Sequence, residues 1–252
     1  APLLRFQLHR RSAESFQFTM SCHHAILDGW SVATLFTELF QETFRLMGGS
    51  DERVSAPASG YNKFVALERE TLESTEAQRY WAGQLSELTR TRLAREQQSE
   101  TEQPRLLDHE VRLGGELSAG LRKLARAAGV PLKSVLLAAH LRALSVFSGQ
   151  REVLTGLVSN GRAEETDGER VLGLFLNTVP FRLQLGGGSW RELVQQTFRA
   201  EQALLPYRRY PLAELQRLAG GGEPLFETAF NFTHFHVYEK LSDVKDVEVL
   251  GV

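Results

Sequence analysis

Alternation of apolar and polar side chains marks two strands near the start of the chain. Apolar residues occupy every second position of residues 4–8 and of residues 16–22, with polar residues between them. This two-residue period is typical of a half-buried strand. Because only a short polar stretch separates the two strands, we expect an antiparallel hairpin. If the second strand continues, its parity places His24 on the apolar face and His23 on the polar face.

A helical pattern follows the second strand directly. Apolar residues recur three and four positions apart between residues 32 and 44, and the glycines at 48 and 49 supply a stop. Ser31 is the predicted N-cap. Gly29 lies in the connecting turn, where a side chain would clash or where φ must be positive. The order of strand, tight turn and helix holds a histidine between two rigid elements, as a catalytic group requires.

The rest of the chain alternates between helical and strand-like patterns in both halves. Helices are expected from residue 61, around residues 80–88, at 116–128, 131–147 and 190–205, and after residue 211; strands are expected at 107–113, 153–158, 174–185 and 224–232. Pro180 inside a strand pattern implies an edge strand or a bulge. His140 is interpreted as a structural residue of its helix. The alternation favours two α/β layers over a single barrel.

A boundary is expected near residue 103. Residues 90–105 contain almost no large apolar side chains, which is typical of a linker. We therefore divide the chain into residues 1–102 and 103–252. The chain begins with Ala, and its last residues resemble an interrupted strand, so we expect a segment truncated at both ends.

The composition is that of an ordinary globular chain, with 42% hydrophobic and 24% charged residues among 252. The net charge is −2, and no basic stripe with interleaved aromatic residues occurs, so we expect no nucleic-acid partner. Cys22 is the single cysteine, which excludes an internal disulfide and fits a cytoplasmic protein. No apolar run reaches about 18 residues and no signal peptide is evident, so no membrane partner is expected.

Several motifs are more specific than these general properties. The pattern His23-His24-x-x-x-Asp28-Gly29 stands between a strand and a helix, and further segments follow it in order at 61–65, 173–182, 207–212 and 224–232. In this set the sequence resembles the condensation domains of nonribosomal peptide synthetases, and more widely the acyltransferases similar to chloramphenicol acetyltransferase. The segment 207–212 lacks the His-Gln-Asp-like run that the family usually has, which leaves the roles of Arg208 and Arg209 open.

The resemblance implies a fold and an activity. The expected fold class is α/β, a two-lobed chloramphenicol acetyltransferase-like fold with mixed sheets and flanking helices. Residues 1–102 would form the C-terminal part of the first lobe, with the histidine motif, and residues 103–252 a second lobe that is incomplete at its C-terminus. The implied reaction is amide-bond formation between a donor acyl or peptidyl thioester and the amine of an acceptor aminoacyl thioester.

The resemblance also implies partners for this reaction. Both substrates would arrive on the phosphopantetheine arms of upstream and downstream peptidyl carrier proteins, with an adenylation domain in the same assembly line. No cofactor bound directly to the chain is expected. The identities of donor, acceptor and peptide product stay open, as does the oligomeric state.

The same resemblance assigns roles to individual residues. His24 matches the catalytic position, either as a base or as a group that positions the amine, with His23 and Gly29 in the same motif. Asp28 and Arg162 are expected to form a structural salt bridge that ties the two lobes together. Two further residues are candidates for substrate binding, Asn231 and Trp30, with a purely structural role as the alternative for each.

The residues of the motif also allow other interpretations. Cys22 as a nucleophile beside His24 is disfavoured by the parity of the strand. A zinc site at His23, His24 and Asp28 is disfavoured because neighbouring residues of a strand point to opposite faces, so no metal is expected. An epimerisation-type sibling domain and a non-catalytic platform that docks carrier proteins remain alternatives. The tail 232–237 adds a further alternative, a starter-type domain that takes a fatty acyl donor.

Overall fold

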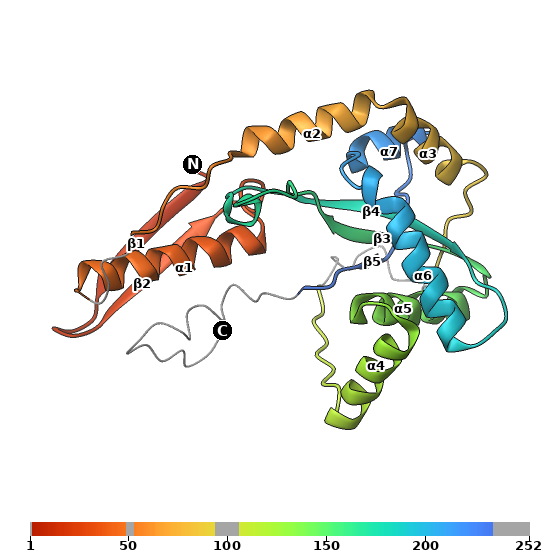
Figure 1. The fold of residues 1–252 in the computed structure, drawn as a ribbon, viewed down its shortest axis with the longest axis horizontal. Helices are drawn as coiled ribbons and strands as arrows, with labels where there is room; N and C mark the ends of the chain where they lie inside the picture. Colours follow the sequence, from red (N-terminus) through yellow and green to blue (C-terminus); the bar gives the residue numbers. More distant parts are fainter. Residues whose placement is uncertain (1, 49–52, 94–105, 234–252) are drawn as a thin grey trace, which may run out of the picture. The chain divides into compact units, whose positions relative to one another are not determined.

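The computed structural model describes residues 2–48, 53–93 and 106–233 (Figure 1). These residues form two compact units. Unit 1 contains the described residues up to Arg69 together with Asn160–Leu176, and unit 2 contains those of Glu70–Ser159 and Asn177–Phe232. The chain therefore passes between the units several times.

The expected boundary between residues 102 and 103 lies outside the described residues. Residues on both sides of it, 70–93 and 106–159, belong to the same compact unit. The compact units therefore do not follow the predicted division, because segment 160–176 packs with the N-terminal part of the chain. Whether residues 1–102 and 103–252 correspond to two lobes of a larger domain stays a prediction.

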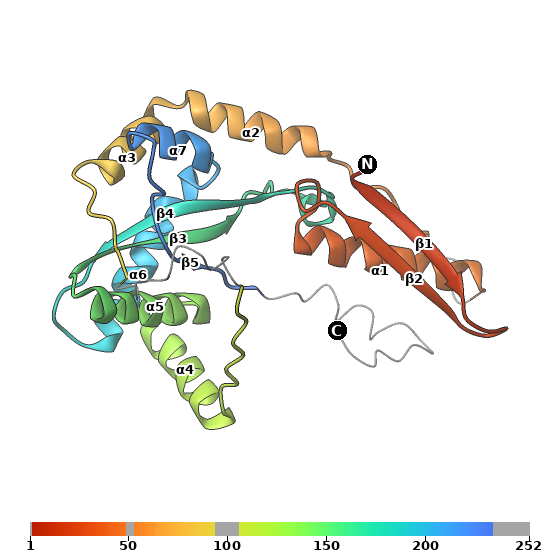
Figure 2. The same cartoon turned by 180° about the vertical axis from the view of Figure 1, so that it is seen from behind.

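Unit 1 is built on the predicted antiparallel hairpin. Strand β1 (Leu4–Arg10) pairs with β2 (Phe16–Cys22), with Phe6 opposite Met20 and Leu8 opposite Phe18. Figures 1 and 2 both show the hairpin beside helix α1 (Gly29–Leu46). The ring of Phe18 meets Phe36 of α1 edge to face at 6.1 Å, so the apolar face of the hairpin packs on the helix.

Unit 2 is built around a three-stranded sheet in the order β4-β3-β5. The strands are β3 (Glu152–Asn160), β4 (Leu176–Gln184) and the short β5 (Ala229–Phe230), which runs parallel to β3. Pro180 lies in β4, at the edge of the sheet among the described strands, and the expected edge position is confirmed.

The predicted helices are present, with shifted ends. They are α2 (Tyr61–Glu73), which starts in unit 1, α3 (Thr75–Leu85), α4 (Gly115–Ala128), α5 (Leu132–Ser148), α6 (Trp190–Leu204) and α7 (Leu212–Leu218). Gly129 ends α4 with φ of 69°, a left-handed conformation that favours glycine. No described helix alone is long and apolar enough to cross a membrane, although α4 and α5 together pass that test as a pair bent by 105°.

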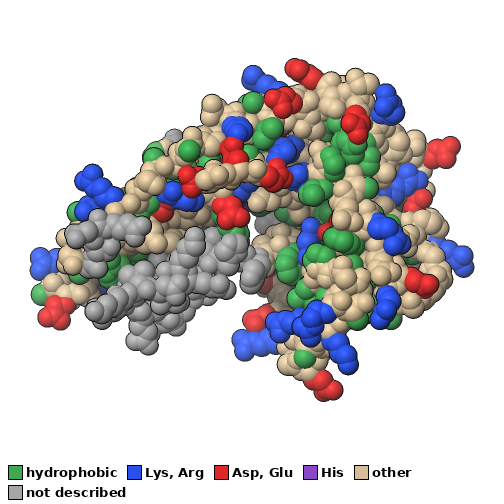
Figure 3. All heavy atoms as spheres, in the orientation of Figure 1, with side chains coloured by type: hydrophobic (Ala, Val, Ile, Leu, Met, Phe, Trp, Pro, Cys, Tyr) green, Lys and Arg blue, Asp and Glu red, His purple; other side chains and the backbone are tan. Residues whose placement is uncertain are grey.

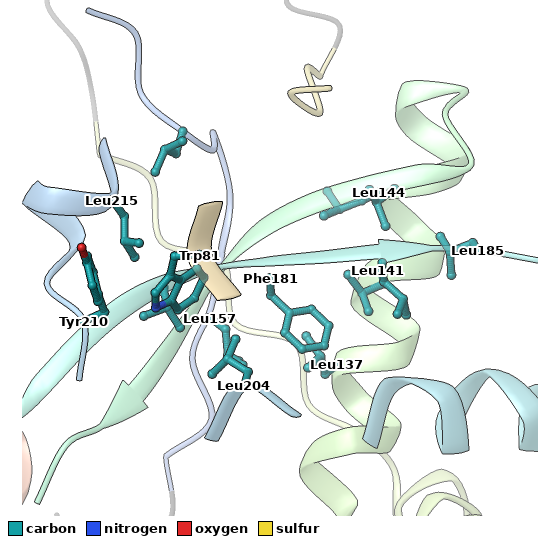
Figure 4. Packing of buried hydrophobic residues seen from close by; sticks show 14 of the residues in the cluster. Trp81, Leu137, Leu141, Leu144, Leu157, Phe181, Leu185, Leu204, Tyr210 and Leu215 are labelled. Atoms are coloured by element: carbon teal, nitrogen blue, oxygen red, sulfur yellow. The ribbon is translucent and has the colours of Figure 1, made fainter. Parts of the chain in front are cut away.

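One apolar core joins the sheet of unit 2 to four of its helices (Figure 4). Trp81 of α3 is fully buried at its centre, and its indole N–H donates to the carbonyl of Tyr207 at 3.3 Å. Leu141 of α5 and Phe181 of β4 belong to the same cluster. Because these side chains come from distant parts of the sequence, the core holds the sheet and its helices together.

His140 is half-buried beside the sheet of unit 2. Its Nε2 lies 3.0 Å from the hydroxyl of Thr155 on β3, and its ring packs near Phe230 of β5. Burial lowers the pKa of His140. These contacts support the structural interpretation of this histidine.

Two predicted strands are corrected. Residues 107–113 form no strand in the structure, and their apolar side chains, such as Leu107 and Val111, are exposed. An alternating pattern makes a strand only where a neighbouring backbone pairs with it, and no described strand pairs with this segment. The strand expected at 224–232 is present only as Ala229–Phe230.

The core makes a direct prediction for stability. Leu141→Ala should lower the free energy of unfolding by about 2–5 kcal/mol, because Leu141 is fully buried and its removal leaves a cavity. Leu117→Ala is the matched control, since Leu117 is also a helical leucine but is 53% exposed. Urea unfolding followed by circular dichroism measures both, and equal destabilisation would contradict the assigned core.

Candidate functional site

The two histidines lie on a turn between β2 and α1. The backbone N–H of His23 donates to Leu3 at 2.7 Å, and its carbonyl accepts from Ile26 at 3.1 Å. The ring Nδ1 of His23 accepts the N–H of Ala25 at 3.1 Å, so a neutral ring carries its proton on Nε2. His23 therefore shapes the turn through both its backbone and its ring.

The predicted orientation of His24 is wrong. Strand β2 ends at Cys22, so the two-residue alternation no longer applies at position 24. The backbone turns instead, and both His23 and His24 are exposed. The imidazole of His24 is thus open to solvent at the end of the hairpin rather than turned into the apolar face.

Asp28 is the anchor at the far end of the turn. Its side chain is 1% exposed, and its Oδ1 accepts the N–H of Ser31 at 2.7 Å, which makes Asp28 the N-cap of α1. Its Oδ2 accepts the N–H of Phe175 at 3.2 Å, and its own N–H donates to Gly173 at 3.0 Å. The predicted cap at Ser31 is wrong, because the carboxylate three residues earlier takes that position.

Arg162 neutralises this buried carboxylate. Its Nη2 lies 2.9 Å from Oδ1 and 3.2 Å from Oδ2 of Asp28, and Arg162 itself is only 5% exposed. Its Nη1 donates to the carbonyl of Val171, and its guanidinium lies 3.9 Å from the ring centroid of Phe175. Burial lowers the pKa of Arg162, and the neighbouring charge of Asp28 opposes that effect.

The structure contains the predicted ion pair. Both residues belong to unit 1, where the pair fixes the segment 160–176 to the start of α1. That the pair ties two lobes together stays a prediction. The pair is an internal support of the unit that carries the histidine turn.

Ser31 extends the same network and was not predicted to do so. Its hydroxyl donates to the carbonyl of Gly173 at 2.8 Å and accepts from Arg162 Nη2 at 2.8 Å and from the N–H of Gly173 at 3.0 Å. A glycine is required at 173, because an added Cβ would overlap the ring of Tyr61. The spacing of three residues between Asp28 and Ser31 places both in the first turn of α1, and this spacing could have indicated that Ser31 belongs to the network.

Gly29 and Trp30 occupy the first turn of α1. Gly29 does not have a positive φ, so the conformational reason expected for this glycine is wrong. The indole N–H of Trp30 donates to the carbonyl of Glu169 at 2.9 Å, which ties this side chain to segment 160–176. This bond gives Trp30 a structural role, and a contact with substrate stays a prediction.

Asn231 lies just beyond β5, which ends at Phe230, and it is exposed. The strand expected at 224–232 therefore does not extend to Asn231. The amide that does connect two motifs is that of Asn177 in β4. It donates to the carbonyls of Arg208 at 3.0 Å and Tyr210 at 2.7 Å, and no feature of the local sequence pattern indicated this.

The arrangement does not suit a metal ion. Both oxygens of Asp28 are engaged by Arg162 and by backbone N–H groups. Among the described residues, no group of three histidine, cysteine or acidic side chains is arranged to hold a metal ion. The group available for chemistry on this turn is the exposed imidazole of His24, and the nearby buried charge of Asp28 is neutralised by Arg162.

Comparison with known proteins identifies the family of this chain. The family model of the condensation domain matches residues 1–251. The chain belongs to the condensation-domain family. The AMB antimetabolite synthetase AmbE of Pseudomonas aeruginosa is 38% identical over 236 residues, which are 93% of this chain and 11% of AmbE. The bacitracin synthase 3 of Bacillus licheniformis is 27% identical over 249 residues, which are 97% of this chain and 4% of that protein.

Solved structures give the same fold. The first condensation domain of the CDA synthetase matches with a TM-score of 0.68 and 25% identity, over 92% of this chain and 52% of that one. The starter condensation domain of rhizomide synthetase matches with a TM-score of 0.70 and 21% identity, over 93% and 54%. The predicted α/β fold class is confirmed, and the chain spans about half of these solved domains and a small part of the synthetases.

The ion pair predicts a large and specific effect on stability. Arg162→Ala should lower the free energy of unfolding by about 3–5 kcal/mol, because it leaves the buried carboxylate of Asp28 without its counter-charge. Arg217→Ala is the control, since Arg217 pairs with Glu214 at the surface, where such pairs contribute less than about 1 kcal/mol. An unchanged melting temperature of Arg162→Ala would contradict the structural role of the pair.

Proposed function

We propose that this condensation domain forms an amide bond between a donor acyl or peptidyl thioester and the amine of an acceptor aminoacyl thioester. The match of the condensation-domain family over residues 1–251 and the similarity to the two synthetases support this proposal. The observation that carries it is the histidine turn, whose exposed imidazole stands four residues before the buried Asp28. The proposed domain would act within nonribosomal peptide synthesis.

The reaction makes defined demands on the site. The nitrogen of the acceptor amine attacks the donor carbonyl, a C–N bond forms, and the carbonyl oxygen becomes an oxyanion. Collapse of this intermediate breaks the C–S bond and releases the donor carrier's thiolate, which becomes the thiol with the proton that the nitrogen loses. The amine must therefore be unprotonated and aimed when it attacks.

His24 is the residue that we assign to this step. A neutral imidazole can accept a hydrogen bond from an amine and can take up its proton near neutral pH. The ring is exposed and follows directly on His23, whose Nδ1 and backbone hold the turn. In this proposal His24 contacts the amine, and His23, Gly29, Asp28 and Arg162 position it.

Partners and substrates follow from the same proposal. Donor and acceptor would be delivered on the phosphopantetheine arms of upstream and downstream peptidyl carrier proteins, with an adenylation domain in the same assembly line. No directly bound cofactor is needed, because both substrates are already thioesters. Asn231 and Trp30 are proposed contacts of the substrate. The proposed setting is the cytoplasm, which fits a chain with a single cysteine.

The alternatives give different products. An epimerisation-type domain would exchange the α-hydrogen of a carrier-bound residue without forming a new amide. A docking platform would bind carriers without changing either thioester. Intact His24 and Asp28 favour the condensation reaction over a platform.

The test is a condensation assay with defined donor and acceptor carriers, followed by intact-protein mass spectrometry. The longest polypeptide that contains this chain is used. His24→Ala should reduce amide formation by about 10²–10⁴-fold, as expected for loss of a proton-transfer group. His9→Ala is the matched control, because His9 is an exposed histidine of β1 outside the motif, and it should leave the rate unchanged.

Unaltered product formation by His24→Ala would reject the catalytic assignment. Carrier binding without any product in the wild-type protein would instead favour the platform. Deuterium incorporation at the α-carbon without amide formation would favour epimerisation.

A further inference from the structure

Unit 2 contains a cavity of about 650 Å³ beside the loop that connects β4 to α6. Its walls include Arg142 of α5, Arg151 just before β3, the glycines of residues 186–188, and Trp190 at the start of α6. The volume lies within the range of small-molecule sites. None of these residues belongs to the histidine turn, so the cavity is not part of the candidate site described above.

The charge of the cavity favours an anion. Arg142 and Arg151 are both exposed, and neither side chain forms an ion pair or hydrogen bond with a described residue. The one carboxylate in the walls, that of Glu192, already accepts the N–H of Ser189 at 2.7 Å and its hydroxyl at 3.0 Å, and these bonds lower the pKa of Glu192. The cavity walls therefore carry two guanidinium groups without a partner among the described residues and one carboxylate that is already hydrogen-bonded.

The glycine run leaves backbone open toward the cavity. A Cβ added at Gly186 or Gly187 would meet no atom within 4 Å, and neither residue has a positive φ. Packing and backbone conformation therefore do not require glycine at these two positions. Glycine at such places lets a ligand approach the backbone closely.

Trp190 supplies a flat apolar wall. Its side chain is 54% exposed although it is the largest apolar residue of α6, and it lines the cavity. Leu185, which is 3% exposed, forms a buried apolar base next to it. An indole beside two guanidinium groups suits a ligand that has both a planar ring and a negative charge.

We propose that this cavity is a second binding site, for a small organic ligand that combines a planar aromatic ring with a phosphate group. Arg142 and Arg151 bind the phosphate through their guanidinium N–H groups, and Trp190 stacks on the ring. The site is separate from the histidine turn and does not depend on the proposed condensation reaction.

The test uses adenosine monophosphate as the probe, with adenosine and inorganic phosphate as the two partial ligands. Isothermal titration calorimetry of the 252-residue chain should give a dissociation constant for adenosine monophosphate at least about tenfold lower than for either partial ligand, because only the whole probe meets both parts of the site. Failure to bind adenosine monophosphate at millimolar concentration would overturn the proposal. Inorganic phosphate that binds as tightly would also overturn it.

Variants separate the site from general surface charge. The double variant Arg142→Gln/Arg151→Gln should weaken binding of the probe at least about tenfold. Arg122→Gln/Arg126→Gln removes the same charge from α4, where Lys and Arg side chains gather in Figure 3, and should leave binding unchanged. An equal loss in both double variants would show binding by charge alone and would contradict the proposal.

The aromatic wall has its own pair of variants. Trp190→Ala should weaken adenosine monophosphate binding and leave inorganic phosphate unaffected, whereas Trp190→Phe should retain most of the affinity. Melting curves confirm that each variant is folded before the titration. Equal affinity of Trp190→Ala and the wild-type chain would contradict the stacking contact.

Discussion

The buried carboxylate of Asp28 is the constraint on which the candidate site depends. A charge that is removed from water is tolerated only where hydrogen bonds and an opposite charge replace its hydration. Here the replacements come from Arg162, from the N–H of Ser31 and from the N–H of Phe175, which lie far apart in the sequence. One side chain thereby fixes the start of α1, and with it the end of the histidine turn, against segment 160–176.

This constraint explains the spacing of the motif. Because Asp28 caps α1, the helix begins at Gly29 and Trp30. Ser31 follows, and its backbone N–H donates to the carboxylate of Asp28. From that turn the indole of Trp30 reaches Glu169 and the hydroxyl of Ser31 reaches Gly173. The acidic half of the motif is thus a scaffold, whereas both histidines are exposed and the ring of His23 supports the turn.

Local periodicity predicted the elements that depend on local order. The hairpin and the helices α4, α5 and α6 follow from alternation, helical spacing and capping residues. The partnership of Asp28 with Arg162 came only from the resemblance to a family, because nothing in the pattern around either residue points to the other. Two predictions failed because they depended on pairing with another segment: residues 107–113 have strand periodicity but no paired strand among the described residues, and the orientation of His24 depends on where pairing with β1 ends. The cap at Asp28 could have been predicted locally, because Asp is a preferred N-cap and its carboxylate accepts the N–H of Ser31 three residues later.

A double-mutant cycle on Asp28 and Arg162 tests the central claim most directly. The free energy of unfolding is measured for the wild-type chain, Asp28→Asn, Arg162→Leu and the double variant. If the two residues act as one buried unit, the double variant is less destabilised than the sum of the single variants by at least about 1–3 kcal/mol. Additive effects within about 0.5 kcal/mol would contradict the account, because they would mean that the two charges do not support each other.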